Sequence, residues 1–345
     1  MDGAELELFA RTLRRATESR TGAALDAALE EVGWQDALAV DVRAAVSMLF
    51  ELQGEANAAS SALDRVVLSG LGLELGSTAA VVLPPLGGWN PPGELDGTHL
   101  YIRGLGTAAL GPAAGIFSMA RSRWSLGASK SDTLLASRKT ALVVARTGDR
   151  EVAVVVTAAD LTLRPVRGID PWLGLVEVTG DVFGAGVQPE PVPTKWASAV
   201  ALGQLALGHE LVGASRKVLE LAREHALQRI QFGRRISAFQ AIRHRLADTL
   251  VAIETADAML AAAWQDRSLQ AAAMAKALAG RGARMAARHC QQVLAGIGFT
   301  TEHPLHRYVR RVLVLDQLMG SARTLTRELG AELLRTKKLP PLLPL

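Results

Sequence analysis

Apolar residues recur at helical spacing throughout the second half of the chain. From about Trp196 they fall three or four residues apart along one stripe, at Leu207, Leu211, Ala214, Val218 and Ala222. The pattern breaks at Phe232 and Gly233 and resumes after Ser237. Two more runs, at residues 271–294 and from about 305 to 334, complete a predicted bundle of four long helices.

The first part of the chain shows the same spacing over shorter runs. Apolar positions three or four residues apart predict helices within residues 6–13, 25–32 and 42–52. Gly33 ends the second of these runs, as glycine commonly does at a helix C-terminus. We therefore expect residues 1–75 to form a helical domain.

The pattern changes at about residue 76, where β-branched runs replace helical spacing. Four such runs predict strands at residues 141–145, 152–157, 161–166 and 175–178. The first two are joined by Thr147-Gly148-Asp149-Arg150, which is a hairpin signal. A turn-rich segment, PEPVP at residues 189–193, closes this part. The sequence thus predicts an α+β fold with three domains, at residues 1–75, 76–193 and 194–345.

Composition narrows the classes of partner. The chain has 345 residues, of which 49% are apolar, enough to fill a sizeable core. The net charge is +4 and aromatic residues make up 4%, so the stacking platforms of nucleic-acid-binding proteins are scarce. We expect no nucleic-acid partner, and we interpret most arginines as part of a solvated helix face.

Targeting signals are equally scarce. Cys290 is the only cysteine, which excludes an internal disulfide and is typical of a reducing compartment. The N-terminus opens with Asp2, Glu5 and Glu7 and has no apolar signal-peptide core. No apolar run approaches the roughly 18 residues that a membrane helix needs. We expect a cytoplasmic protein with no membrane partner.

Three motifs in the second half become informative when they are taken together. They are R-I-Q-F-G at 229–233, F-Q-A-I-R-H-R-L-A-D at 239–248 and Q-V-L-A-G-I-G-F-T-T-E-H-P-L-H at 292–306. In this order and at this spacing they resemble the C-terminal half of the acyl-CoA dehydrogenase family. The resemblance implies a C-terminal four-helix bundle, a middle β-domain and an N-terminal helical domain, here truncated. It also implies FAD as cofactor and an acyl-CoA thioester as substrate.

The middle of the chain departs from this family where the flavin ring would bind. The family carries there a T-E-P-x-x-G-S-D type loop and a W-x-T or W-x-S segment, and the sequence contains neither. The nearest stretches, Leu110–Trp124 and Ser125–Asp132, keep small residues but not the pattern. We expect a degenerate site for the flavin ring.

The catalytic carboxylate is the second departure. In the family reaction a carboxylate removes the α-proton of the thioester while a hydride leaves the β-carbon for the flavin, so the base must flank that bond. By resemblance, one family position for the base holds Met319 and the other falls on Gly203 or Gln204. None of these side chains takes a proton at neutral pH.

Glu210 is the candidate base that remains on the same helix. It lies seven residues beyond Gly203, within about 20° of the same face but about 10 Å further along the helix. The alternative is a structural carboxylate paired with a cation on a neighbouring helix. Asp316 is a weaker substitute. We interpret four histidines as packing or loop-fixing residues, and no pair of them predicts a metal site: His209, His244, His303 and His306.

The surviving motifs have a defined task in the family. In its homo-oligomers, the Arg and Phe of R-x-x-F-G and the Gln and glycines of Q-x-x-G-G-x-G reach across a subunit interface to the FAD of the neighbouring chain. A planar guanidinium suits phosphate oxygens, and glycine permits close backbone approach. Ala295 stands in place of one glycine. By resemblance this role falls on Arg229, Gln231, Phe232, Gln292, Gly296 and Gly298.

The combination resembles the shorter, partner subunit of the actinobacterial heteromeric (α2β2) steroid-CoA dehydrogenases. The leading hypothesis is a subunit that completes the FAD site of a second acyl-CoA dehydrogenase-family chain, which supplies the base. Two alternatives stay open. One is a self-sufficient dehydrogenase with Glu210 as base, and the other is a non-catalytic or flavin-hydroxylase relative whose bundle is an oligomerisation scaffold.

Overall fold

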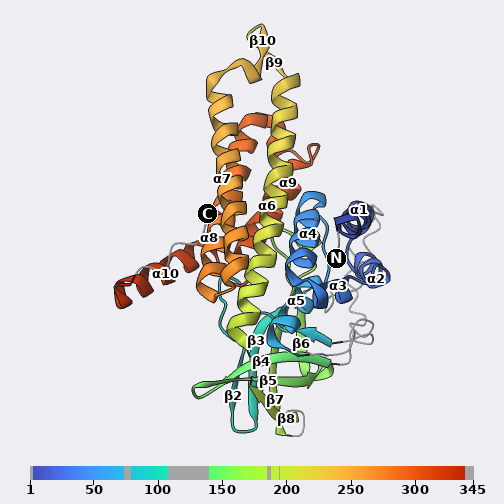
Figure 1. The fold of residues 1–345 in the computed structure, drawn as a ribbon, viewed down its shortest axis with the longest axis vertical. Helices are drawn as coiled ribbons and strands as arrows, with labels where there is room; N and C mark the ends of the chain where they lie inside the picture. Colours follow the sequence, from blue (N-terminus) through green and yellow to red (C-terminus); the bar gives the residue numbers. More distant parts are fainter. Residues whose placement is uncertain (1–2, 74–78, 108–139, 185–187, 194, 339–345) are drawn as a thin grey trace, which may run out of the picture.

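The computed structural model describes residues 3–73, 79–107, 140–184, 188–193 and 195–338. Short helices come first, a sheet follows, and long helices complete the chain. Figure 1 shows the long helices running side by side along the molecule, with the sheet at one end and a small hairpin at the other. The α+β class predicted from the sequence is confirmed, whereas the three domain boundaries stay predictions.

The N-terminal part contains α1 (Gly3–Ser19), α2 (Ala23–Glu31), α3 (Trp34–Val40), α4 (Val42–Ala56) and α5 (Ala62–Leu71). Helical spacing predicted α1, α2 and α4 but not α3 or α5. Helix α4 packs closely on α6 (Trp196–Gln228), because glycine stands at two points of contact. A Cβ on Gly54 would lie 2.1 Å from the carbonyl oxygen of Glu210, and one on Gly213 would lie 2.0 Å from that of Glu51. This approach brings the turn after α4 beside Glu210.

The sheet has the strand order β6-β7-β3-β2-β4-β5-β8, and β1 pairs with β4 in parallel. Successive side chains of a strand point to opposite faces of the sheet and therefore pack into different cores. Val144 packs with the helices, whereas its neighbour Val143 joins a separate core on the other face. The strands are β1 (Ala79–Val81), β2 (Gly93–Asp96), β3 (His99–Gly106), β4 (Thr140–Thr147), β5 (Arg150–Thr157), β6 (Leu161–Pro165), β7 (Val176–Phe183) and β8 (Gln188–Pro193).

The sheet corrects two expectations. Strands β2 and β3 were not predicted, although β3 pairs along its whole length with β7. The segment at 189–193 was predicted as a turn and is part of strand β8, which pairs antiparallel with β5. Strand β8 ends the strand order, and proline is tolerated in edge strands because its missing N–H can face away from the ladder. The predicted hairpin between β4 and β5 is confirmed, with Gly148 at φ 56°.

The bundle contains α6, α7 (Gln240–Asp266), α8 (Leu269–Leu294) and α9 (Leu305–Gln317), and α10 (Ala322–Thr336) follows. The continuous fourth run predicted from the sequence is wrong, because residues 318–321 break it. Met319 and Gly320 have φ of 52° and 99°, which no helix accepts. Helix α10 then begins at Ser321, whose hydroxyl accepts the Thr324 N–H at 3.1 Å. No helix within the described ranges has the length and hydropathy to cross a membrane.

Candidate functional site: two ends of helix α6

The two positions at which the resemblance places a base meet in the structure. Met319 is buried, and its Sδ lies 2.2 Å from the place that a Cβ on Gly203 would occupy. The thioether therefore fills the space in front of Gly203. The adjacent Gln204 is also buried, and its Nε2 donates to the Met319 carbonyl oxygen at 3.0 Å. Neither family position offers a carboxylate.

A buried lysine fixes the turn that carries Met319. Lys276 on α8 donates from Nζ to the carbonyl oxygens of Leu315, Asp316 and Gly320 at 3.0, 3.1 and 3.4 Å. Burial lowers the pKa of Lys276 to about 8, while the nearby Asp316 opposes that shift. Sequence analysis did not single out this residue. Its signal was a lone lysine in the alanine-rich stripe of α8, where it lies among buried positions.

Asp316 belongs to the same turn. Its side chain accepts from Arg284 Nη1 at 2.9 Å and from the Ala322 N–H at 3.0 Å. The carboxylate thus ties α9 to α8 and to the start of α10. These contacts give Asp316 a structural task.

Glu210 lies two turns further along α6, in a buried group of charges. Its Oε1 is 3.4 Å from Arg311 Nη1 on α9, and Arg311 Nε is 2.6 Å from Asp170 Oδ2. Burial raises the pKa of Glu210 to about 7, against the opposing effect of Arg311, and Asp170 adds to the rise. Glu210 is therefore paired with a cation on a neighbouring helix, which is the structural alternative that the sequence left open. Its assignment as a base stays a prediction.

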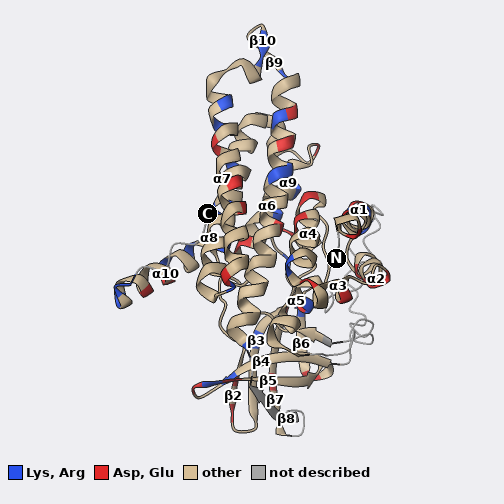
Figure 2. Ribbon diagram, viewed as in Figure 1, with Lys and Arg blue, Asp and Glu red and all other residues tan. Residues whose placement is uncertain are grey.

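The R-I-Q-F-G motif forms an exposed hairpin at the far end of α6. Strand β9 (Ile230–Gln231) pairs with β10 (Arg234–Arg235), and Phe232 and Gly233 turn between them with φ of 52° and 73°. Phe232 is 88% exposed, and its ring meets Phe239 edge-on at 6.2 Å. Residues 229–239 include three arginines and no acidic residue, and Figure 2 shows this basic tip.

The glycine-containing part of the motif at 292–306 follows α8 as a 3-10 turn, η5 (Ala295–Phe299). Gln292 and Gly296 are exposed, and a Cβ on Gly296 would meet no atom within 4 Å. Gly298 differs, because a Cβ there would lie 3.0 Å from the Gln291 carbonyl oxygen. Gly296 therefore leaves room for a ligand, whereas Gly298 permits the chain's own turn. The replacement at Ala295 has a cost, because its φ of 52° and ψ of −134° favour glycine.

These groups fit the phosphate end of a dinucleotide. Arg229, Gln231 and Gln292 are exposed donors whose side chains form no hydrogen bond or ion pair within the described segments. Arg229 follows Gly203 by 26 residues, which corresponds to about 39 Å along a helix. The hairpin therefore lies far from the chain's own base position. The stretches expected near the flavin ring, Leu110–Trp124 and Ser125–Asp132, lie outside the described residues.

The histidines of the motifs have local roles. His209 is buried and Nε2 accepts from Trp264 Nε1 at 3.0 Å, and burial lowers the pKa of His209 to about 4. His303 Nδ1 accepts the Leu305 N–H at 3.2 Å, and His306 Nδ1 lies 2.7 Å from the His303 carbonyl oxygen. His244 is exposed on α7. In the described part of the chain no three His, Cys, Asp or Glu side chains are placed to hold a metal.

Comparison with known proteins gives one family match and several similar proteins. Residues 197–334 match the model of the acyl-CoA dehydrogenase C-terminal domain. The acyl-CoA dehydrogenase IpdE2 of Mycobacterium tuberculosis is 32% identical over 273 residues, which cover 77% of this chain and 80% of that protein. The acyl-CoA dehydrogenase FadE34 of the same species is 34% identical over 191 residues, 52% of this chain and 26% of that protein.

Two solved structures share the fold. A variant of the Tcur3481–Tcur3483 steroid ACAD has a TM-score of 0.71 and 19% identity, and the match covers 97% of this chain and 99% of that chain. The ChsE4–ChsE5 complex from Mycobacterium tuberculosis has a TM-score of 0.69 and 19% identity, with 99% of each chain covered. At this identity the two matches establish the architecture of the chain.

Proposed function

Because this chain belongs to the acyl-CoA dehydrogenase family, whose members are FAD-dependent oxidoreductases, we propose that it is one subunit of a heteromeric enzyme. It completes the FAD site of a partner chain of the same family, in an α2β2 assembly. The partner supplies the carboxylate that removes the α-proton of an acyl-CoA thioester. This chain contributes binding and orientation of the cofactor.

The contact between Gly203 and Met319 carries the proposal. Met319 occupies the space that a side chain at position 203 would need, so one family position for the base is filled by a thioether and blocks the other. The turn is held by Lys276 through three carbonyl groups, which makes a simple rearrangement costly. A carboxylate base must lie within hydrogen-bond reach of the substrate proton, and neither base position at this end of α6 holds a carboxylate.

The other end of α6 supports the role toward a partner. The proposed cofactor ligands are Arg229 and Gln231 of the hairpin and Gln292 with the open backbone at Gly296. When bound, FAD accepts the hydride that leaves the β-carbon. Arg229 would bind a pyrophosphate oxygen with its planar donor groups, and the exposed Phe232 ring would cover an apolar part of the partner site. Ile230 of the same hairpin is 60% exposed, so the tip presents two apolar side chains close together in the sequence.

The proposed substrate class is the CoA thioester of a steroid or its side chain. Support comes from the solved structure of similar fold that is a steroid ACAD. The ChsE4–ChsE5 complex, which shares the architecture, supports the assembly of two chains. We also propose a cytoplasmic location, supported by the single cysteine, which needs no oxidising compartment.

The flavin content of the chain alone and with a family partner tests the proposal. The two are expressed separately and together, and flavin absorbance, native mass and dehydrogenase activity are measured for each. We expect a defined α2β2 mass, bound flavin and activity only on co-expression. A flavin-loaded, active homo-oligomer of this chain alone would contradict the proposal and would make Glu210 the first residue to replace.

The geometry gives no support to the two alternatives. Glu210 as an independent base would have to leave its buried contact with Arg311 to reach a substrate. A mere oligomerisation scaffold does not account for unpaired donors beside an open glycine backbone. Both alternatives predict a different result in the flavin measurement. A self-sufficient dehydrogenase would bind flavin without a partner, and a scaffold would not increase the flavin content of a partner.

A further inference from the structure

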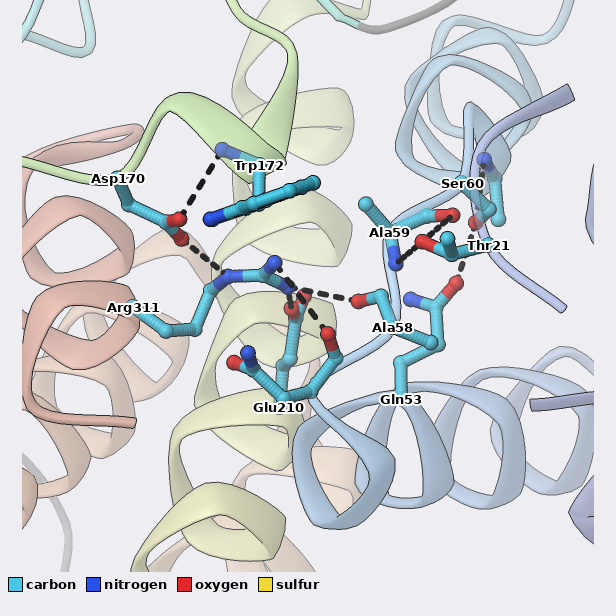
Figure 3. Close-up of polar contacts among 11 residues, drawn as sticks. Thr21, Gln53, Ala58, Ala59, Ser60, Asp170, Trp172, Glu210 and Arg311 are labelled. Atoms are coloured by element: carbon cyan, nitrogen blue, oxygen red, sulfur yellow. Dashed lines mark hydrogen bonds and ion pairs between the residues drawn. The ribbon is translucent and has the colours of Figure 1, made fainter. Parts of the chain in front are cut away.

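Arg311 is the meeting point of all three parts of the chain. Its guanidinium is 1% exposed and donates to groups from three directions. Nε contacts Asp170 Oδ2 at 2.6 Å, in the connection between β6 and β7. Nη1 contacts the Ala58 carbonyl oxygen at 2.7 Å and Glu210 Oε1 at 3.4 Å, and Nη2 contacts the Asn57 carbonyl oxygen at 3.5 Å. Figure 3 shows this arrangement.

Local backbone geometry aims the N-terminal ligands at Arg311. Asn57 caps α4 in the left-handed region with φ 53° and ψ 34°, a conformation that asparagine tolerates. The turn exposes the carbonyl groups of Asn57 and Ala58 to α9. On the other side, Asp170 accepts the Trp172 N–H at 3.3 Å and so starts the 3-10 turn η2 (Pro171–Leu173). Local backbone geometry on both sides therefore places the two carbonyl groups and the Asp170 carboxylate around Arg311.

The charges in this group do not balance if all three side chains are ionised. One guanidinium faces two carboxylates, Asp170 and Glu210, whose side chains are 2% and 5% exposed. Three other polar side chains line the same small cavity of about 30 Å³ as Glu210, and none of them carries a charge: Gln53, Ser60 and Thr107. An unpaired buried charge is expensive, and a carboxyl group avoids that cost by keeping its proton.

The distances identify which carboxyl group keeps the proton. The contact of Arg311 with Asp170 is a short charge-assisted hydrogen bond at 2.6 Å, whereas its contact with Glu210 is long at 3.4 Å. We propose that Arg311 and Asp170 form an ionised latch that joins the N-terminal helices, the sheet and the bundle, and that Glu210 enters this latch as an uncharged acid. The latch thereby holds α9, which leads into the turn that carries Met319.

Burial supports this assignment and gives it a pH dependence. The pKa of Glu210 is raised from 4.5 to about 7, with burial as the largest cause. An acid whose folded pKa is raised adds stability below its unfolded pKa and loses it as the pH rises through the folded value. The charged groups that face Glu210 in the described part of the chain are Arg311 from α9 and Asp170 from the β6–β7 connection. The chain should therefore lose stability between about pH 4.5 and pH 7.

Glu210→Gln tests the uncharged state, because glutamine imitates a protonated glutamate. The full chain, in the assembly in which it purifies, is unfolded thermally at several pH values from 5 to 8.5. We expect the melting temperature of Glu210→Gln relative to wild type to rise with pH and to level off above about pH 7. The same substitution in a surface ion pair, Glu55→Gln, removes a partner of Arg14 at 2.8 Å and should show no such rise.

Asp170→Asn distinguishes the role of the Asp170 carboxyl group from that of Glu210. It removes the ionised partner of Arg311, so at pH 8 it should lower the melting temperature far more than Glu210→Gln does. An infrared carbonyl band of a protonated carboxylic acid, present at pH 6 and absent in Glu210→Gln, is the direct readout. The proposal is overturned if wild type lacks that band, or if Glu210→Gln and Asp170→Asn are equally destabilising at pH 8.

Discussion

Helix α6 has opposite character at its two ends. Near its start, Gly203 and Gln204 are buried against the turn that carries Met319, and a sulfur atom fills the space where a carboxylate would work. At its C-terminal end, Arg229 leads into a hairpin whose Phe232 is 88% exposed. The inward-facing positions are packed like an ordinary core, whereas the outward-facing ones keep unpaired donors and an exposed ring. This contrast is what the proposed role toward a partner chain requires.

The largest expected effect is on the outward end. Arg229→Ala should weaken retention of FAD by the heteromer about 10- to 100-fold, because a hydrogen bond between charged groups contributes about 1.5–3 kcal/mol. The measurement is flavin released per complex on dilution or dialysis. Since the Arg229 side chain is exposed and forms no hydrogen bond or ion pair with the described residues, the fold should be unaffected.

Arg150→Ala is the matched control for that measurement. Arg150 is also an exposed arginine at a β-hairpin, but it lies in the sheet at the other end of the molecule (Figure 1). It should leave flavin retention unchanged. Equal retention in the Arg229→Ala and Arg150→Ala complexes would remove the hairpin from the cofactor site and, with it, the difference between the two ends.

Substitutions at the inward end of α6 should change the stability of the protein and leave flavin binding unchanged. Gly203→Ala places a Cβ 2.2 Å from Met319 Sδ, and overpacking of this kind costs about 1–3 kcal/mol of unfolding free energy. The flexible thioether can move part of the way, which favours the lower half of that range. Denaturant unfolding of the complex measures the change, and its flavin content should stay at the wild-type level.

A double variant shows whether the contact itself is responsible. Met319→Ala removes the sulfur, so Gly203→Ala should then lower the unfolding free energy much less. The effects of the two substitutions on the unfolding free energy should therefore be strongly non-additive. If they add, the strain arises elsewhere around Gly203. If instead either variant lowers flavin content, this end of α6 takes part in cofactor binding and the two ends are not separate.

The fold could be predicted where local pattern decides it. The runs that became α6, α7 and α8 have unambiguous helical spacing, and the hairpin after β4 has a turn signal that belongs to a known type. Strand β8 was missed because three of its six residues are prolines, which weaken any strand prediction. Only its place at the sheet edge makes them acceptable, and that place depends on β5, far earlier in the chain.

The site was predictable only in part, for a related reason. The sequence alone shows which residues stand at the two base positions and which motif residues are present. The contact of Gln204 with Met319 joins residues 115 apart, and no spacing rule reports it. Lys276 and Arg311 are unusual as buried cations, but their partners are backbone carbonyls and carboxylates of other elements. Such compensation exists only once the elements are packed.

The smallest expected effect concerns the turn beside Gly296 at the outward end. Ala295 has φ 52° and ψ −134°, where its Cβ is strained and glycine is not. Relief of that strain in Ala295→Gly is opposed by the greater freedom of glycine in the unfolded chain. We expect a net stabilisation of about 1 kcal/mol, since such backbone strain is of order 1–3 kcal/mol and the entropic cost of glycine is about 0.4–1 kcal/mol. Ala247→Gly, at an exposed position inside α7, should instead destabilise by about 1 kcal/mol. Thermal unfolding of both variants decides the sign, and a loss of stability in Ala295→Gly would mean that the alanine is not strained at this helix end.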